Sequence, residues 1–134
     1  MKTKLFLSVL LSFIFGVLSS QVPQGFNYQA IARDGSGNPI SDPIVVKIAI
    51  LASDNTTVIY EEQHNGVDPN DDGLFTIVVG NGTPIAGLAN FSLIDWTVSP
   101  KFLRTKIVYN GEKDLGSTKL NSVPYAMAVS YTHL

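Results

Sequence analysis

The sequence predicts an all-β fold, an antiparallel β-sandwich of about six or seven short strands. Three observations support this prediction. Apolar and polar residues alternate with a period of two in several short segments. Clusters of Gly, Pro, Asn and Asp separate these segments, as turns do. No amphipathic helical pattern longer than two turns follows the first twenty residues.

The predicted strands follow one another along the chain with turn signals between them. They occupy residues 26–32, 44–51, 57–64, 73–80, 101–109 and 117–123. Asn110 and Gly111 favour a hairpin between the last two, because both residues tolerate positive φ. Residues 81–89 are rich in Gly and are expected to be irregular. Residues 91–96 fit either a short helical turn or an edge strand.

Two of the predicted strands should form the centre of the core. In residues 44–51 the even-numbered side chains are all β-branched and apolar, and in residues 73–80 apolar side chains also occur at every second position. Because side chains of a strand alternate between its two faces, each set should lie on one face, and the two faces should meet. Ile48 and Phe75 are therefore expected to be buried. The other face of residues 44–51 is also mostly apolar, which is typical of a central strand.

The first twenty residues have the three parts of a secretory signal peptide. Two lysines precede an apolar run at residues 5–18, and small residues up to Ser20 close it. The run is about 14 residues long, shorter than the roughly 20 needed for a membrane-spanning helix. We therefore expect a signal helix that is cleaved near Ser20, a secreted or cell-surface protein, and no membrane span after cleavage.

This pattern divides the chain into three parts. Residues 1–20 are the expected signal peptide, residues 21–123 the β-sandwich module, and residues 124–134 a connector with a truncated tail. The module has about 100 residues, which is enough for one domain with its own core.

Composition excludes several classes of protein. The chain of 134 residues has no Cys, so disulfides, a thiol nucleophile and a thiolate metal site are all excluded. Its net charge of −2 becomes more negative when the two lysines of the signal are removed. Nucleic acids require a concentrated basic face, and no such stripe is present, so no nucleic-acid partner is expected.

The sequence carries no arrangement of residues typical of an enzyme, and we expect neither catalysis nor a cofactor. His64 and His133 are the two histidines, and neither has a partner at catalytic or metal-binding spacing. Glu61 and Glu62 point to opposite faces of a strand, which suits paired acid–base chemistry poorly. Glu62 and His64 share one face, and we expect a surface ion pair between them.

One acidic segment is a candidate cation site. Asp68, Asn70 and Asp72 are spaced like the first oxygen ligands of a calcium loop, and Gly73 follows them. The closing carboxylate of such a loop would fall at Val79, inside a predicted strand. An acidic β-turn that leads into the strand is the alternative.

Three aromatic residues are candidates for a binding surface. Tyr60, Trp96 and Tyr109 would form a platform for sugar rings if their faces were exposed. Burial in the core is the usual fate of large aromatic side chains in a small β-sandwich, and it is the alternative.

Two sequence blocks carry a resemblance to a known group of proteins. They are VPQGFNYQAIARD with the following GNPI, at residues 22–34 and 37–40, and LNSVPYA at residues 120–126. With them the chain resembles the N-terminal leader module of large exported surface or fibre-type proteins of Bacteroidota, in which collagen-like repeats or tail-fibre-like domains follow. The resemblance implies a structural role, no catalytic residues, and downstream domains of the same polypeptide as partners. The middle of the chain is also similar to prealbumin-like stalk domains.

The last five residues, SYTHL at 130–134, depart from this resemblance. We expect them to be a truncated, non-native end, with a natural short tail as the alternative. The function expected from the sequence is that of a non-enzymatic exported structural module, which caps, spaces or anchors the rest of a cell-surface or fibre-like protein. The alternative is an adhesin-like module that binds glycan or a surface protein, and a hydrolase fragment is the third possibility.

Overall fold

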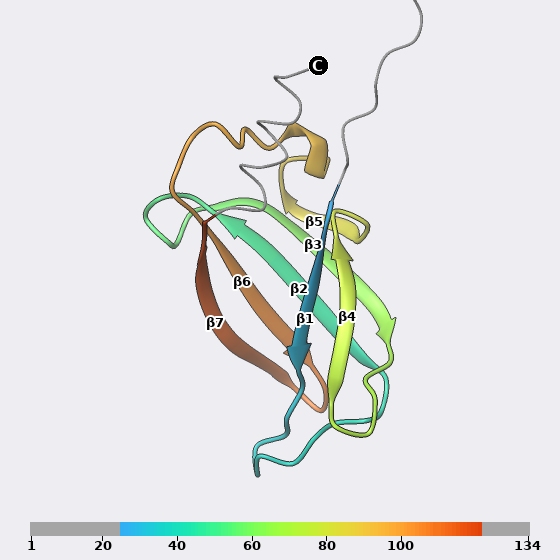
Figure 1. Ribbon diagram of the computed structural model, residues 1–134. Helices are drawn as coiled ribbons and strands as arrows, with labels where there is room; N and C mark the ends of the chain where they lie inside the picture. Colours follow the sequence, from blue (N-terminus) through green and yellow to red (C-terminus); the bar gives the residue numbers. More distant parts are fainter. Residues whose placement is uncertain (1–24, 122–134) are drawn as a thin grey trace, which may run out of the picture.

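The computed structural model describes residues 25–121 and contains seven strands in two antiparallel sheets (Figure 1). The strands are β1 (Phe26–Ile31), β2 (Ile44–Leu51), β3 (Val58–Val67), β4 (Leu74–Val79), β5 (Thr83–Gly87), β6 (Lys101–Val108) and β7 (Glu112–Leu120). One sheet has the order β1-β4 and the other β5-β3-β2-β6-β7. The all-β prediction is confirmed. The expected signal helix and the expected connector lie outside the described residues.

The two sheets pack face to face, like the layers of a β-sandwich, with β1 and β4 in front of the larger sheet in Figure 1. The core between them is built from the alternating side chains of the strands. Ile48 is fully buried and Phe75 is 2 % exposed, as predicted for these two positions. The even-numbered residues of β2 and the odd-numbered residues of β4 from Phe75 onward are all buried in this core.

A polar contact joins β1 to the larger sheet. Tyr28 on β1 lies beside Phe75, with ring centroids 6.4 Å apart, and its hydroxyl accepts a hydrogen bond of 2.7 Å from Thr105 Oγ1 on β6. Thr105 is buried, so the bond satisfies a hydroxyl that would otherwise lose its contact with water. The bond fixes the position of β1 over β6.

The outer face of β2 is partly covered, as expected for a central strand. Ala49 lies opposite Glu61 on β3 and Arg104 on β6, and it is fully buried. Glu61 Oε2 accepts a hydrogen bond of 2.7 Å from Arg104 Nη2, so an ion pair connects the two strands that flank Ala49. A small side chain at this position leaves room for the pair.

Three segments differ from the predictions or settle an open alternative. Residues expected to be irregular form β5, which pairs with β3 at the edge of the sheet, where Pro84 is tolerated. Residues 91–96 contain a short 3₁₀ turn, η1 (Phe91–Leu93), and no strand. The last hairpin turns at Asn110 and Gly111, both with positive φ, and β7 begins at Glu112, earlier than expected.

The described chain enters and leaves the fold at one end. At the start of β1, Phe26 packs against Trp96, with ring centroids 6.5 Å apart, and Leu120 at the end of β7 lies opposite Lys101. We call this the proximal end; Figure 1 shows it at the top, together with η1. The distal end is made by three connections, at residues 32–43, 68–73 and 109–111. Among residues 25–121, no helix has the length and apolar character needed to cross a membrane.

Candidate functional site

Strand β3 brings three ionisable side chains onto one face. Tyr60, Glu62 and His64 are two residues apart, so the alternation of the strand directs all three the same way. Glu62 is fully buried. Its Oε2 accepts a hydrogen bond of 2.7 Å from the Tyr60 hydroxyl, and its Oε1 lies 2.6 Å from His64 Nε2. An ionised carboxylate only accepts hydrogen bonds, so His64 Nε2 is the donor.

The carboxylate of Glu62 also reaches the smaller sheet. The backbone N–H of Gly80, directly after β4, donates to both oxygens of Glu62, at 2.9 Å and 3.1 Å. We call these four residues (Tyr60, Glu62, His64 and Gly80) the Glu62 cluster. The cluster connects β3 of the larger sheet to the end of β4 in the smaller sheet.

A tight turn closes over the Glu62 cluster. A Cβ atom added to Gly82 would lie 2.8 Å from His64 Nε2 and 3.0 Å from Glu62 Cγ and Cδ. Gly80 has φ of 107°, which strongly favours glycine. The two glycines therefore let the backbone approach the buried carboxylate closely enough to cover it.

The surroundings of Glu62 and Tyr60 shift the pKa values of both side chains. Burial by itself would raise the pKa of Glu62, but hydrogen bonds from His64, Tyr60 and Gly80 lower it below its ordinary value. Burial and the bond to Glu62 raise the pKa of Tyr60. The cluster therefore holds an ionised Glu62 and a neutral Tyr60.

We predicted an ion pair between Glu62 and His64 on the surface, and the location is wrong. The two side chains do meet, at 2.6 Å, but Glu62 is buried and the side chain of His64 is only 11 % exposed. The reason is the cover supplied by the turn after β4, which lies far away in the sequence. Both oxygens of Glu62 are occupied by protein donors, so the arrangement serves to join the sheets.

This cluster predicts how stability depends on pH. A group with a lowered folded-state pKa stabilises the fold above its unfolded pKa, about 4.3 for Glu, and this contribution is lost as pH falls through the folded pKa. We expect the difference in free energy of unfolding between the native protein and Glu62→Gln to be largest near neutral pH and to shrink below about pH 4. Urea denaturation at a series of pH values measures it; a difference that stays constant down to about pH 2 would contradict the role of Glu62.

Of the three candidate cation ligands, Asn70 closes the turn before β4. Asp68, Asn70 and Asp72 are all exposed. Asn70 Oδ1 accepts hydrogen bonds of 3.0 Å from the backbone N–H groups of Asp72 and Leu74. The Asn70 side chain thus closes its own loop, as Asn side chains commonly do in turns. Within residues 25–121, no group of three His, Cys, Asp or Glu side chains is arranged to hold a metal ion.

The three candidate aromatic residues do not form one platform. Tyr60 is 1 % exposed, so its ring face is not available to a ligand and the alternative of burial holds for this residue. Its ring lies 5.7 Å from Phe91, and Trp96 lies 5.5 Å from the same ring, half-buried at the proximal end. Tyr109 is at the distal end, where its hydroxyl donates a hydrogen bond of 2.8 Å to Asp42. Tyr60 can be buried because its ring packs against Phe91 and its hydroxyl donates a hydrogen bond to Glu62.

A comparison with protein families identifies one match. Residues 27–121, which run from β1 to just after β7, match a family described as "Domain of unknown function (DUF8740)". The match covers more than half of the chain. The chain belongs to this family. The DUF8740 region includes all four residues of the Glu62 cluster and both sheets except Phe26, the first residue of β1. No curated protein and no solved structure matches the chain.

Proposed function

We propose that this chain is a non-enzymatic structural module of a larger exported protein of the cell-surface or fibre type, and that it caps that protein. The resemblance of its two sequence blocks to leader modules of Bacteroidota is one support. The observation that carries the proposal is the position of the two described chain ends, which both lie at the proximal end.

The position of the ends favours a cap over a spacer in series. In a spacer, the chain enters at one end and leaves at the other, so that neighbouring domains lie on opposite sides. Here the start of β1 and the end of β7 both lie at the proximal end, and the distal end is left free.

The Glu62 cluster, which lies between the two sheets, also supports a structural role. An acid, an imidazole and a phenol are the groups that enzymes use for proton transfer. In this fold Tyr60 and Glu62 are buried and His64 nearly so, and their bonds to one another and to Gly80 hold the two sheets together. A module stiffened in this way suits a folded block at the end of a longer assembly.

The gene and the exported product test the proposal. We expect the natural reading frame to continue after residue 129 into a further domain, and electron microscopy of the intact protein to place the module at its tip. We also expect surface-exposed material to begin at Gln21 or a neighbouring residue in N-terminal sequencing. A stop codon directly after residue 129 or 134, density on both sides of the module, or exported protein that still begins with Met1 would each contradict it.

A further inference from the structure

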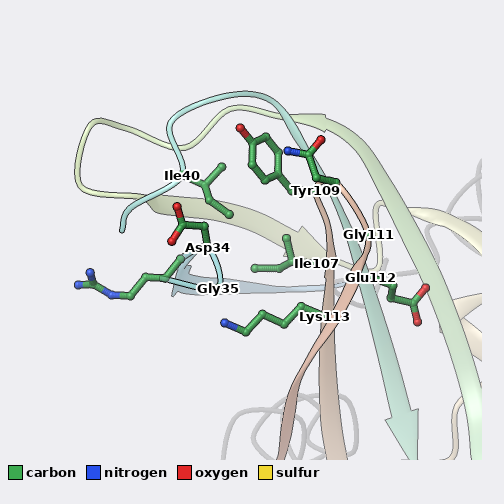
Figure 2. A pocket seen from close by; sticks show the side chains of 10 residues that line it. Asp34, Gly35, Ile40, Ile107, Tyr109, Gly111, Glu112 and Lys113 are labelled. Carbon is green, nitrogen blue, oxygen red and sulfur yellow. The ribbon is translucent and has the colours of Figure 1, made fainter. Parts of the chain in front are cut away.

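A pocket opens at the distal end of the fold. It has a volume of about 430 Å³ and lies between the loop that follows β1 and the hairpin of β6 and β7 (Figure 2). Pockets that bind small ligands have volumes of roughly 300–1,000 Å³, so this one is large enough for a small molecule. Because it lies at the end opposite the two described chain ends, attachment of further domains at the proximal end would leave it open.

The apolar wall of the pocket is ordered in the absence of a ligand. Ile40 and Ile107 line it and are only 6 % and 3 % exposed, so they belong to the core as well as to the pocket. Tyr109 forms another part of the wall, and its hydroxyl is held by Asp42. A ligand would therefore meet a rigid apolar surface whose order is established before binding.

The two acidic side chains at the pocket differ in what they leave free: within the described residues Asp34 keeps Oδ2 unbonded, whereas Glu112 is held by two lysines. Asp34 Oδ1 accepts hydrogen bonds of 2.9 Å from the backbone N–H groups of Ser36 and Asn38, which closes the loop after β1. Glu112 bonds to Lys47 at 2.9 Å and to Lys106 at 3.1 Å, on the outer face of the sheet. Figure 2 shows the Glu112 carboxylate directed away from Lys113 and from the pocket.

The two basic side chains retain free donors. Lys113 lies opposite the buried Ile107, so it is on the inner face of β7, and in Figure 2 it extends toward Gly35. Its ammonium group has no hydrogen bond or ion pair with any residue in the range 25–121. Arg33 uses one nitrogen, which donates to the Gly37 carbonyl at 2.9 Å. Glu112 is paired with two lysines, so Arg33 and Lys113 together outweigh the single carboxylate of Asp34, and the remaining charge at the pocket is positive.

We propose that this pocket binds a sugar unit that bears a carboxylate, of the uronic acid class. The carboxylate would bond to Lys113 and Arg33, since charge-assisted hydrogen bonds are the strong ones. The apolar face of the sugar ring would lie against Ile107 and Tyr109. The ring hydroxyls would pair with Asp34 Oδ2 and with backbone groups of Gly111; a purely aliphatic carboxylate would leave these groups without partners in the bound state. This binding activity goes beyond the capping role and does not depend on it.

Titration of the full chain, labelled with ¹⁵N, by D-glucuronate tests the proposal. We expect saturable changes of the amide resonances of Gly35, Gly111 and Lys113. D-glucose at the same concentration tests the need for the carboxylate, and acetate tests the need for the sugar ring; sodium chloride is used to match the ionic strength. Both are expected to bind at least tenfold more weakly than glucuronate.

Two single substitutions separate the site from a general effect of charge. Lys113→Gln is expected to weaken glucuronate binding about tenfold, the loss typical of a hydrogen bond to a charged group. Lys119→Gln removes the same charge from the same strand, opposite Phe102 and at the proximal end, and should leave binding unchanged. Equal binding of glucose, equal binding of acetate, equal losses in the two variants, or shifts confined to residues elsewhere would each overturn the proposal.

Discussion

Replacing Glu62 with alanine is expected to lower the free energy of unfolding by about 3–5 kcal/mol. The change removes the shared acceptor of Tyr60, His64 and Gly80. It leaves three donors without their acceptor, of which the Tyr60 hydroxyl is fully buried, and it creates a cavity where the side chain lay. The connection between β3 and the end of β4 is lost at the same time. Denaturation in urea at neutral pH measures the effect.

Glu61→Ala is the matched control for this substitution. Glu61 is the adjacent residue on the same strand, carries the same charge, and forms an ion pair with Arg104 in which both side chains are partly exposed. Ion pairs near the surface contribute little, so we expect a loss of at most about 1 kcal/mol. Equal losses for the two alanine variants would show that the Glu62 cluster does not stabilise the fold.

Phe75→Ala is expected to destabilise the protein by about 3–5 kcal/mol. Phe75 projects from β4 into the core and packs beside Tyr28. Truncation removes the free energy gained by burying the ring and leaves a cavity between the two sheets. The cavity persists because hydrogen bonds between the strands allow the surroundings to relax only in part. The β1-β4 sheet has two strands, so it has few other contacts that could compensate. The midpoint of urea denaturation is the measurement.

Leu74→Ala provides the comparison on the other face of the same strand. Leu74 is 36 % exposed and lies opposite Ile31 on the outer surface. Its truncation leaves no enclosed cavity, and we expect a loss below about 1 kcal/mol. A loss for Phe75→Ala that is no greater than the loss for Leu74→Ala would show that the core lies elsewhere.

The strands that could be predicted from the sequence are those with a clear period of two. Residues 44–51 and 73–80 alternate apolar residues without a break, and the bounds of β2 and β4 agree closely with them. Local patterns were sufficient there because burial on one face fixes both the strand and its register. The hairpin at Asn110 and Gly111 was predictable for a similar reason, since its turn chemistry is local.

The edge strands could not be predicted in the same way. β5 contains Pro84 and Gly87, has no buried residue, and becomes a strand through its pairing with β3. In β7, Gly116 has φ of 91°, and the register with β6 shifts between Arg104 and Lys106. An interrupted register hides the alternation that a sequence pattern depends on. In both cases the neighbouring strand, and not the local sequence, decides the structure.

The burial of Glu62 depends on a contact that is distant in the sequence. Residues 61–64 read as an exposed polar segment, EEQH, with no apolar residue to indicate a core. The cover comes from the turn at Gly80 and Gly82, 18 residues after Glu62 for the Gly80 contact. Two glycines close together after a strand were the available signal, since glycine permits close approach of a backbone. Only the packing of the sheets indicates which residue they approach.

The edge of the larger sheet at β7 bears on how copies of this protein behave beside one another. An unpaired strand edge is a template on which a second chain can add, and it is a common origin of aggregation. The nine residues of β7, EKDLGSTKL, include four charged side chains of both signs, and the register shift near Gly116 interrupts the ladder. An incoming strand would have to accommodate both charge and irregular spacing. We therefore expect that copies of this protein at high local concentration do not form fibrils by strand pairing at β7.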